Sequence, residues 1–205
     1  MSPISKIVFA SGNPGKIREV AEILSDLNIT VVPQKEFDIE SPEETGSTFV
    51  ENALLKARYA SAQSGLPAIA DDSGIVVDAL DGRPGVWSAR YAGEYATDED
   101  NVNKLLEEMT DVLPTERGGE FHCAAVLVCP GEEVDPLVAE STWRGEILLE
   151  PRGDGGFGYD PVFFDRRFMK TGAEMSPEEK NSVSHRGRAF RELRNLLVQR
   201  QARNQ

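Results

Sequence analysis

A glycine-containing turn near the N-terminus combines three features of an anion-binding site. Residues 11–16 (Ser-Gly-Asn-Pro-Gly-Lys) join an apolar stretch, residues 4–10, to a segment whose apolar residues recur at helical spacing. Free backbone N–H groups and the positive end of a helix dipole meet at such a turn, and Lys16 adds a full charge. The glycine spacing differs from the Gly-x4-Gly-Lys-Ser/Thr loop of kinases and ATPases, which disfavours that class. An ordinary strand-to-helix turn remains the alternative.

Two pairs of carboxylates could bind a metal ion or move a proton. Asp71 and Asp72 follow the apolar run 68–70, which predicts that they end a buried strand with their side chains on opposite faces. Only one of them can then face a cleft, where it could ligand Mg²⁺ or deprotonate a water. Glu43 and Glu44 lie in a polar stretch just before a predicted helix. A turn between strands and solvated loop charge are the respective alternatives.

A second group of candidate residues lies toward the C-terminus. Residues 153–161 (Gly-Asp-Gly-Gly-Phe-Gly-Tyr-Asp-Pro) place four glycines around two aromatics, which is too flexible for a core strand and predicts a binding loop. Phe157 could stack on a base. Lys180, His185 and Arg186 follow, and the guanidinium fork of Arg186 suits oxygen or N7 acceptors on a base edge. A tight turn with structural aromatics and a solvated helix terminus would use the same residues.

The elements that must position these residues alternate between strand and helix, which predicts an α/β fold. Apolar runs predict strands over residues 4–10, 121–129 and 138–147, the last two as a hairpin with its turn at residues 130–132. Apolar periodicity predicts helices after Lys16 and Thr48, over residues 98–109, after Ser176 and over residues 185–201. Thr48 with Glu51 and Ser176 with Glu179 have the spacing of capping boxes.

Length and charge narrow the classes of function. The chain of 205 residues is expected to form one domain, residues 1–205, or two closely packed lobes. A formal net charge of −13 disfavours binding to nucleic acid and to anionic membrane surfaces. The charge is uneven, because residues 151–205 carry 11 basic and 7 acidic side chains, a balance of +4. An anion held near the C-terminal end is therefore expected.

Cysteine and histidine usage indicates the kind of metal site and the compartment. A strand would hold Cys123 and Cys129 about 20 Å apart, too far for a disulfide. With two histidines in the sequence, a zinc site is disfavoured, so any metal should be bound through oxygen. No run approaches the ~18 apolar residues of a membrane span. The N-terminus shows no export signal, which predicts a cytoplasmic protein.

Taken together, these segments closely resemble the non-canonical purine nucleoside triphosphate pyrophosphatases, also called inosine or xanthosine triphosphate pyrophosphatases. Nearly the whole chain takes part in the resemblance. Six ordered motifs carry it: residues 11–16, residues 43–53 (Glu-Glu-Thr-Gly, then Phe-Val-Glu-Asn-Ala at 49–53), residues 70–74 (Ala-Asp-Asp-Ser-Gly), residues 82–93 (Gly-Arg-Pro-Gly-Val-Trp-Ser-Ala-Arg-Tyr-Ala-Gly), residues 155–161, and residues 178–186 (Glu-Glu-Lys-Asn, then Ser-His-Arg).

The resemblance implies hydrolysis of ITP, dITP and XTP to the monophosphate and pyrophosphate, with Mg²⁺, by a homodimer of two-lobed α/β chains. The expected fold is a mixed sheet with flanking helices, like that of inosine triphosphatases, with the active-site cleft between the lobes. The resemblance implies that Glu43 and Asp72 bind the metal and that Asp72 is also the proton acceptor. The substrate contacts it implies are Ser11, Gly12, Asn13, Pro14, Gly15, Lys16, Lys56, Ser73, Phe157, Gly158, Tyr159, Asp160, Lys180, His185 and Arg186.

Two other classes of function remain beside this one. A nucleotide-sensing module would bind the same ligand without turnover, and a nucleotide kinase or phosphotransferase would need an acceptor for the γ-phosphate. The expected partner in every case is a small purine nucleotide rather than a polymer. The products formed from ITP distinguish the three.

Overall fold

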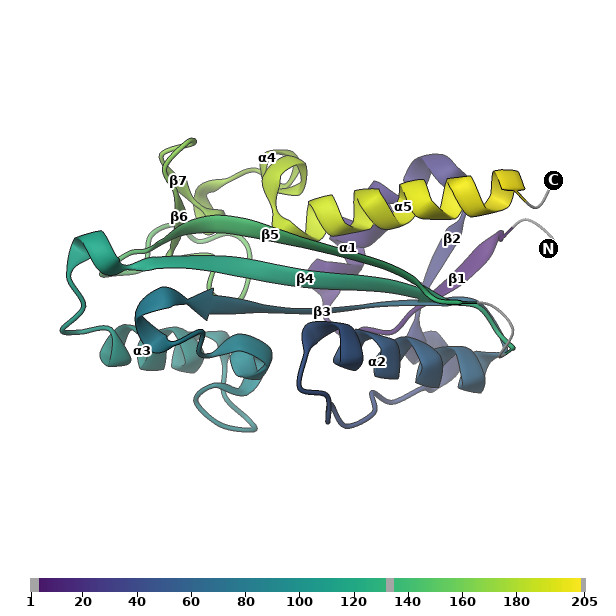
Figure 1. Ribbon diagram of the computed structural model, residues 1–205, viewed down its shortest axis with the longest axis horizontal. Helices are drawn as coiled ribbons and strands as arrows, with labels where there is room; N and C mark the ends of the chain where they lie inside the picture. The colour runs from purple at the N-terminus through teal and green to yellow at the C-terminus, as the bar shows by residue number, and fades with distance from the viewer. Residues whose placement is uncertain (1–3, 132–134, 204–205) are drawn as a thin grey trace. The chain divides into compact units, whose positions relative to one another are not determined.

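The computed structural model describes residues 4–131 and 135–203, and its elements alternate as predicted (Figure 1). The helices in these ranges are α1 (Pro14–Ile23), α2 (Phe49–Ser64), α3 (Asp98–Glu108), α4 (Pro177–Val183) and α5 (His185–Arg203). The strands are β1 (Lys6–Phe9), β2 (Thr30–Pro33), β3 (Ala68–Val77), β4 (Gly118–Val128), β5 (Leu137–Ile147), β6 (Phe163–Asp165) and β7 (Lys170–Thr171).

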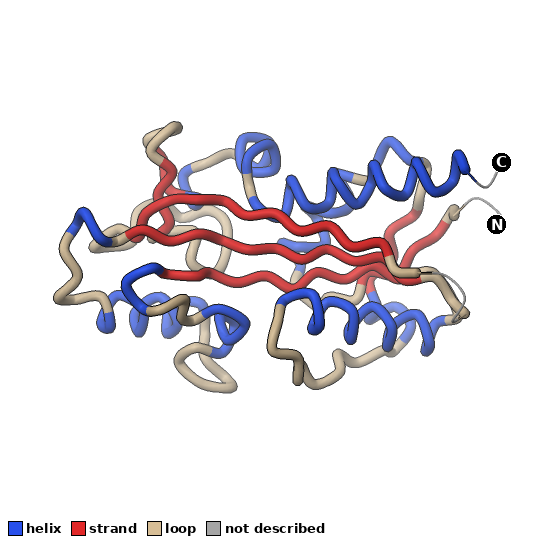
Figure 2. The backbone as a smooth tube through the Cα atoms, viewed as in Figure 1, coloured by secondary structure: helices blue, strands red, loops and turns tan. Residues whose placement is uncertain are grey.

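The strands form one mixed sheet in the order β2-β1-β3-β4-β5-β6-β7. β1 is parallel to β2 and β3, whereas β6 is antiparallel to β5 and β7. The predicted fold class, a mixed sheet with flanking helices, is therefore confirmed (Figure 2). β4 and β5 are neighbours, as a hairpin requires. The predicted turn at residues 130–132 ends in residue 132, which lies outside the described residues.

The predicted helix starts that were marked by capping-box spacing are confirmed. Thr48 and Ser176 each accept a hydrogen bond from the backbone N–H three residues later, and the glutamate there bonds back, which completes both capping boxes. Thr97 forms a third capping box with Asp100. These reciprocal bonds satisfy N–H groups that a helix N-terminus leaves without partners, so the helices begin at defined residues.

The chain divides into two compact units. Unit 1 contains residues 1–72, 123–141 and 186–205, and unit 2 contains residues 73–122 and 142–185. The backbone passes from unit 1 to unit 2 within β3, after Asp72.

Unit 1 is a sheet covered by helices on both faces. Its strand residues alternate between two cores. Ile7, Phe9 and Ile69 pack with α1 and α5 residues such as Val20 and Phe190. On the other face, Val8, Ala68 and Ala70 pack with the alanines of α2, Ala53, Ala57 and Ala60. Figure 1 shows α5 and α2 on these opposite sides of β3 and β4.

Unit 2 has a core built on aromatic residues. Phe121, Trp143 and Phe163 contact one another, with ring centroids 4.5 to 6.1 Å apart. Apolar residues of α3, including Leu105 and Met109, pack into the same cluster.

One boundary prediction was wrong in a way that matters for the site. Asp71 and Asp72 were expected at the end of a strand, but β3 continues for five residues beyond them to Val77. The alternative interpretation, a turn between strands at these aspartates, is also wrong, because Ile75 and Val77 are fully buried in unit 2 and continue the strand. The two carboxylates therefore lie in the middle of a strand rather than on a loop.

Candidate active site

The turn before α1 is held by a side-chain cap. Asn13 Oδ1 accepts hydrogen bonds from the backbone N–H groups of Gly15 at 2.8 Å and Lys16 at 3.2 Å, and Pro14 occupies the first helical position. Ser11 Oγ accepts a further bond from the Asn13 N–H at 3.2 Å. The side-chain cap thus already uses two N–H groups of the predicted anion cradle, and the full charge that the turn offers is the ammonium of Lys16.

Asp71 binds the ammonium of Lys16 on the α1 and α5 face of the sheet. The distance from Lys16 Nζ to Asp71 Oδ2 is 3.0 Å, and the carboxylate is fully buried. The same oxygen accepts a hydrogen bond from Arg186 Nε at 3.2 Å, and Arg186 Nη1 donates to Glu19 Oε2 at 2.8 Å. Four charged side chains from α1, β3 and α5 are therefore linked in unit 1.

Asp72 points to the opposite face of the sheet, as strand alternation predicted. Its Oδ1 lies 2.8 Å from Lys56 Nζ, and its Oδ2 accepts from Asn52 Nδ2 at 3.3 Å. Burial raises the pKa of Asp72 above the ordinary carboxyl value, although the charge of Lys56 opposes that shift. Burial would by itself lower the pKa of Lys56, but the carboxylates of Asp72 and Glu44 outweigh it and raise that pKa. Lys56 thus stays charged beside Asp72.

The two glutamates before α2 differ in their surroundings. Glu44 Oε1 lies 2.7 Å from Lys56 Nζ, so that Lys56 bridges Glu44 and Asp72. Glu43, the predicted metal ligand, is exposed. Within residues 4–131 and 135–203, no group of three or more His, Cys, Asp or Glu side chains is arranged to hold a metal ion. The carboxylate oxygens of Asp72 and Glu44 converge on the ammonium of Lys56.

In unit 2, the carboxylate of Asp160 holds the predicted binding loop, residues 153–161, through hydrogen bonds. Asp160 Oδ2 accepts from the Phe157 N–H at 2.8 Å and from Lys180 Nζ at 2.6 Å. Lys180 Nζ also lies 4.5 Å from the centroid of the Phe157 ring. Gly156 adopts φ +72°, and a Cβ there would lie 2.2 Å from Asp160 Oδ2, so this tight turn requires glycine.

Two more contacts fix the loop to other parts of unit 2. The Gly158 N–H donates to Asp98 Oδ2 at 2.7 Å, at the start of α3. The Tyr159 hydroxyl donates to the Ser88 carbonyl at 2.9 Å. Asp160 and Tyr159 are both buried, whereas Phe157 is half-buried. The loop that carries the Phe157 ring is thus fixed by hydrogen bonds to Asp98 and to the Ser88 carbonyl.

His185 lies in an aromatic stack of unit 2. Its ring is 4.7 Å from Phe121, at an interplanar angle of 10°, and 6.4 Å from Trp143, at 18°. Trp143 Nε1 donates to the buried carboxylate of Asp165 at 2.8 Å. Ser73 follows Asp72 on β3 and is half-buried.

The predicted site residues therefore form two groups. Unit 1 brings together Lys16, Lys56, Asp72 and Arg186. Unit 2 brings together Phe157, Gly158, Tyr159, Asp160 and Lys180, with Ser73 and His185 also in that unit.

The Ham1 family model matches residues 7–196. The chain belongs to the Ham1 family.

Similar proteins match it over nearly the whole length. A protein of Shigella flexneri and one of Escherichia coli K12, both named dITP/XTP pyrophosphatase, are each 52% identical over 95% of this chain and 98% of their own. The solved structure of a HAM1 protein from Coxiella burnetii superposes with a TM-score of 0.87 at 47% identity, covering 96% of this chain and 100% of that one. The Ham1 protein of Staphylococcus aureus gives 0.84 at 41% identity, over 95% of this chain and 99% of that one.

Sequence reasoning missed Glu19 and Asn52 of the unit 1 cluster, and it named Glu44 only together with Glu43. Asn52 could have been found, because it lies four residues before Lys56 and so on the same face of α2. Glu19 likewise follows Lys16 by three residues on α1. Glu44 carries no local signal that separates it from Glu43.

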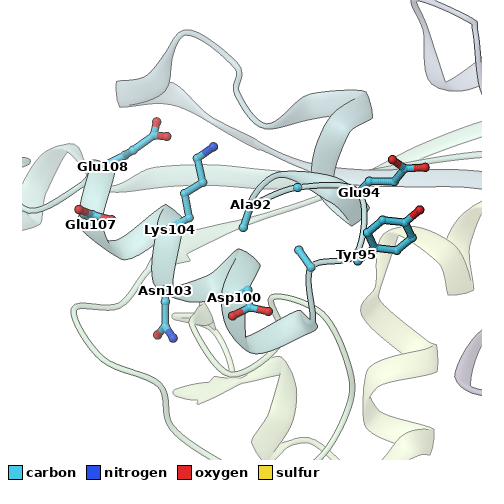
Figure 3. Close-up of a pocket in the computed structure, with 10 residues that line it drawn as sticks. Ala92, Glu94, Tyr95, Asp100, Asn103, Lys104, Glu107 and Glu108 are labelled. Atoms are coloured by element: carbon cyan, nitrogen blue, oxygen red, sulfur yellow. The ribbon is translucent and has the colours of Figure 1, made fainter.

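A pocket elsewhere in unit 2 contains none of the predicted site residues (Figure 3). It is an open hollow of about 890 Å³ beside α3. Figure 3 shows Glu94 and Tyr95 on the segment before α3 and Lys104, Glu107 and Glu108 on the helix itself. Lys104 Nζ donates to the Tyr91 carbonyl at 2.7 Å, and Glu108 Oε2 accepts from the Tyr91 hydroxyl at 2.6 Å. These charges stabilise the segment that precedes α3.

Proposed function

We propose that this chain hydrolyses the non-canonical purine nucleoside triphosphates ITP, dITP and XTP to the nucleoside monophosphate and pyrophosphate. Such an enzyme cleanses the nucleotide pool and prevents incorporation of these bases into nucleic acid. The relatives named dITP/XTP pyrophosphatase support the substrate class. The observation that carries the chemistry is the pair of adjacent carboxylates on β3, each bound to a different lysine, beside the capped turn of α1.

The phosphate end of the substrate is assigned to unit 1. Residues 11–16 and the ammonium of Lys16 offer hydrogen bonds and positive charge at the N-terminus of α1. Lys56 supplies a second buried cation, whose raised pKa keeps it protonated. Negative charge that develops on the departing pyrophosphate is stabilised by such preorganised cations.

Asp72 is the group that accepts the proton of the attacking water. Burial raises its pKa toward the working pH, which favours a general base because proton transfer is then driven more strongly. Asn52 and Lys56 fix the orientation of its two oxygens. The water attacks the α-phosphorus, the bond to the β-phosphate oxygen breaks, and the proton passes to Asp72.

The oxygens around Lys56 also fit a hard divalent cation. Carboxylate oxygens of Asp72 and Glu44 converge within 2.8 Å of one ammonium, and oxygen is the ligand that Mg²⁺ prefers. We therefore propose that Asp72 binds Mg²⁺ with Glu44, which lies beside it, or with Glu43, as the resemblance implies. When bound, the ion would neutralise phosphate charge and polarise the phosphorus–oxygen bonds.

The base end is assigned to the loop and the stack of unit 2. Phe157 offers an aromatic face on which any purine can stack. Lys180, held between Asp160 and the Phe157 ring, is a donor that suits the oxo groups of hypoxanthine and xanthine. Ser73, Gly158, Tyr159 and His185 complete the predicted substrate contacts.

One assay separates hydrolysis from the two other classes. The protein is incubated with ITP and Mg²⁺, and the products are resolved chromatographically. Hydrolysis at the α-phosphorus gives IMP and pyrophosphate. IDP with a phosphorylated acceptor would instead identify a phosphotransferase, and unchanged ITP with measurable binding would identify a sensor.

Two further proposals depend on the resemblance and on the sequence. We propose that the chain works as a homodimer, which light scattering on the purified protein would test. We also propose a cytoplasmic location, which fractionation of the source cells would test. The helices in the described ranges do not combine the length and the apolar composition of a membrane span.

A further inference from the structure

Two neighbouring residues of the predicted binding loop are held by parts of unit 2 that are distant in the sequence. The Gly158 N–H donates to Asp98 Oδ2 at 2.7 Å, across 60 residues, and the Tyr159 hydroxyl donates to the Ser88 carbonyl at 2.9 Å, across 71 residues. Asp98 is the first residue of α3, and Ser88 lies in residues 82–93, called here the support segment. The proposed substrate contacts include neither α3 nor the support segment, so a different role must account for these bonds.

The support segment and α3 are joined to each other. Asn101 of α3 accepts a hydrogen bond at Oδ1 from the Ala92 N–H at 2.8 Å, and its Nδ2 donates to the Ala89 carbonyl at 3.2 Å. Ser88 Oγ accepts from the Ile75 N–H at 2.9 Å, which fastens the support segment to β3. Asn101 and Ser88 are buried, and hydrogen bonds removed from water in this way are electrostatically stronger. The start of α3 is therefore a fixed point from which the loop can be held.

The backbone beside the Phe157 ring is bonded both within the loop and to α3. The Phe157 N–H donates to Asp160 Oδ2 at 2.8 Å, and the Asp160 N–H donates to the Phe157 carbonyl at 3.3 Å. The next N–H, that of Gly158, is the one bound by Asp98. Gly158 adopts φ +61°, and a glycine can leave this conformation as easily as it enters it. The carboxylate of Asp98 therefore restrains the loop at the point where its backbone has the most freedom.

We propose that Asp98 is a positioning residue for the base end of the substrate: by binding the Gly158 N–H, it fixes the peptide that follows Phe157 and so the position of the Phe157 ring. The bond has a charged acceptor, which makes it stronger than a bond between neutral groups. The inference rests on the proposed function, in that Phe157 is the residue that contacts the base. Loss of the Asp98 carboxylate should then weaken binding of the base and leave the phosphate end of the site unchanged.

Three variants separate this hydrogen bond from the other effects of an acid at a helix start. Asp98→Ala removes the acceptor, and Asp98→Asn keeps an oxygen that can accept from the Gly158 N–H. Glu99→Ala is the matched control, because Glu99 is the next residue of α3 and is likewise an exposed acid in its first turn. Both alanine variants remove one negative charge from the positive end of the helix dipole, whereas Asp98→Ala also removes the bond to the loop.

Amide hydrogen exchange tests the positioning without any substrate. The amides of Phe157 and Asp160 are followed by NMR, because their acceptors lie within the loop and they report on its order. We expect their exchange to be about fivefold faster in Asp98→Ala than in the wild type, the scale of one hydrogen bond. In Asp98→Asn and in Glu99→Ala the rates should stay within about twofold of the wild type. Unchanged exchange in Asp98→Ala, or an equal acceleration in Glu99→Ala, would overturn the proposal.

Kinetics and pyrophosphate binding connect the loop to the substrate. In Asp98→Ala, KM for ITP should rise about fivefold at unchanged kcat, because the lost interaction contributes to binding of the base before and during the reaction. The dissociation constant of Mg²⁺-pyrophosphate, measured by calorimetry, should keep its wild-type value. Partial unfolding would instead lower the apparent kcat at unchanged KM.

The kinetic outcomes that contradict the proposal are distinct from those that contradict the proposed function. A lowered kcat in place of the raised KM, or a KM in Asp98→Asn as high as that in Asp98→Ala, would overturn the positioning role of Asp98. Absence of ITP hydrolysis by the wild type would contradict the proposed function. The exchange measurement would still decide whether Asp98 fixes the loop.

Discussion

The two groups of site residues are built on different principles. In unit 1, the side chains are charged, they come from helices and a central strand, and each is paired with a partner of opposite sign. In unit 2, the candidate site is a glycine-rich loop with aromatic rings, and a buried ion pair, Lys180 with Asp160, holds the loop itself. Under the proposed function, helices and a strand would present the charges that bind the triphosphate, and a glycine-rich loop would present the surface that meets the base.

This difference predicts that substitutions in the two units have different effects on the reaction with nucleotides. Substitutions among the unit 1 charges should reduce reaction with all nucleotides, because phosphates are common to them. Substitutions in unit 2 should affect affinity for the base or the stability of the loop. Variants that mix the two effects would contradict the division.

The largest effect is expected from Asp72→Asn. A general base contributes typically about 10²–10⁴-fold, so turnover of ITP should fall by that factor while ITP binding persists through the separate phosphate contacts. Steady-state kinetics and calorimetry on the same preparation measure the two quantities. Asp81→Asn is the matched control, since it makes the same change at an exposed aspartate after β3. Equal loss of binding and of turnover would contradict this role.

Unlike a substitution at an exposed position, Asp71→Asn should also change the properties of the protein, although Asp71 is not the proposed base. The side chain faces away from Asp72, as predicted, but it is fully buried against Lys16 and Arg186. Its replacement should therefore lower stability as well as phosphate affinity.

The next effect concerns the ion pair that holds the loop of unit 2. Lys180→Met leaves the carboxylate of Asp160 buried without its ammonium, and breaking a buried pair in this way costs about 3–5 kcal/mol of unfolding free energy. Urea unfolding measures the loss. The double variant Lys180→Met with Asp160→Asn should recover most of it, because an amide oxygen can still accept from the Phe157 N–H. A double variant no more stable than Lys180→Met would show that the pair is not the cause.

A smaller effect on stability, which depends on pH, is expected at Asp165, whose carboxylate accepts a hydrogen bond from Trp143 of the aromatic stack. Burial would by itself raise the pKa of Asp165, but hydrogen bonds from Arg167 and Trp143 outweigh it and lower the pKa to about 2. A carboxyl whose pKa is lowered on folding stabilises the fold above its unfolded value of about 3.9, and this contribution is lost as the pH falls toward 2.

Asp165→Asn tests that sign directly. At pH 6 the wild type should be more stable than the variant by about 2 kcal/mol, and the difference should shrink between about pH 4 and pH 2. Urea unfolding at several pH values measures it. A difference that stays constant over that range would show that the carboxylate charge is not responsible.

The sequence predicted those parts of the molecule that depend on local chemistry. Capping signals placed the starts of α2 and α4, and the two-residue period of a strand put Asp71 and Asp72 on opposite faces. The continuation of β3 past Ser73 was missed, because burial of Ile75 and Val77 depends on tertiary packing in unit 2.

The partners of Arg186 show why the long-range ion pairs of the candidate site could not be predicted from the sequence. They lie 115 and 167 residues away along the chain, and no spacing in the sequence connects them. The choice between Glu43 and Glu44 depends on the path of a loop, which has no period. Electrostatic partners of this kind are settled by the fold as a whole.

The smallest effect, and the sharpest test of the comparison, is expected from Phe157→Ala. Stacking of a base on an aromatic ring is worth about 1–3 kcal/mol, so kcat/KM for ITP should fall by about tenfold. The ring presents the same face to every purine, and therefore kcat/KM for ATP should fall by a similar factor, leaving the ITP-to-ATP ratio nearly unchanged. Steady-state kinetics with both nucleotides decides this, with Phe168→Ala as the control at a half-exposed phenylalanine of the same unit. Pyrophosphate binding by Phe157→Ala should be unchanged, because the proposed function assigns the phosphates to unit 1. If Phe157→Ala also weakens pyrophosphate binding, the phosphate and base ends are not separable in the way that the two units suggest.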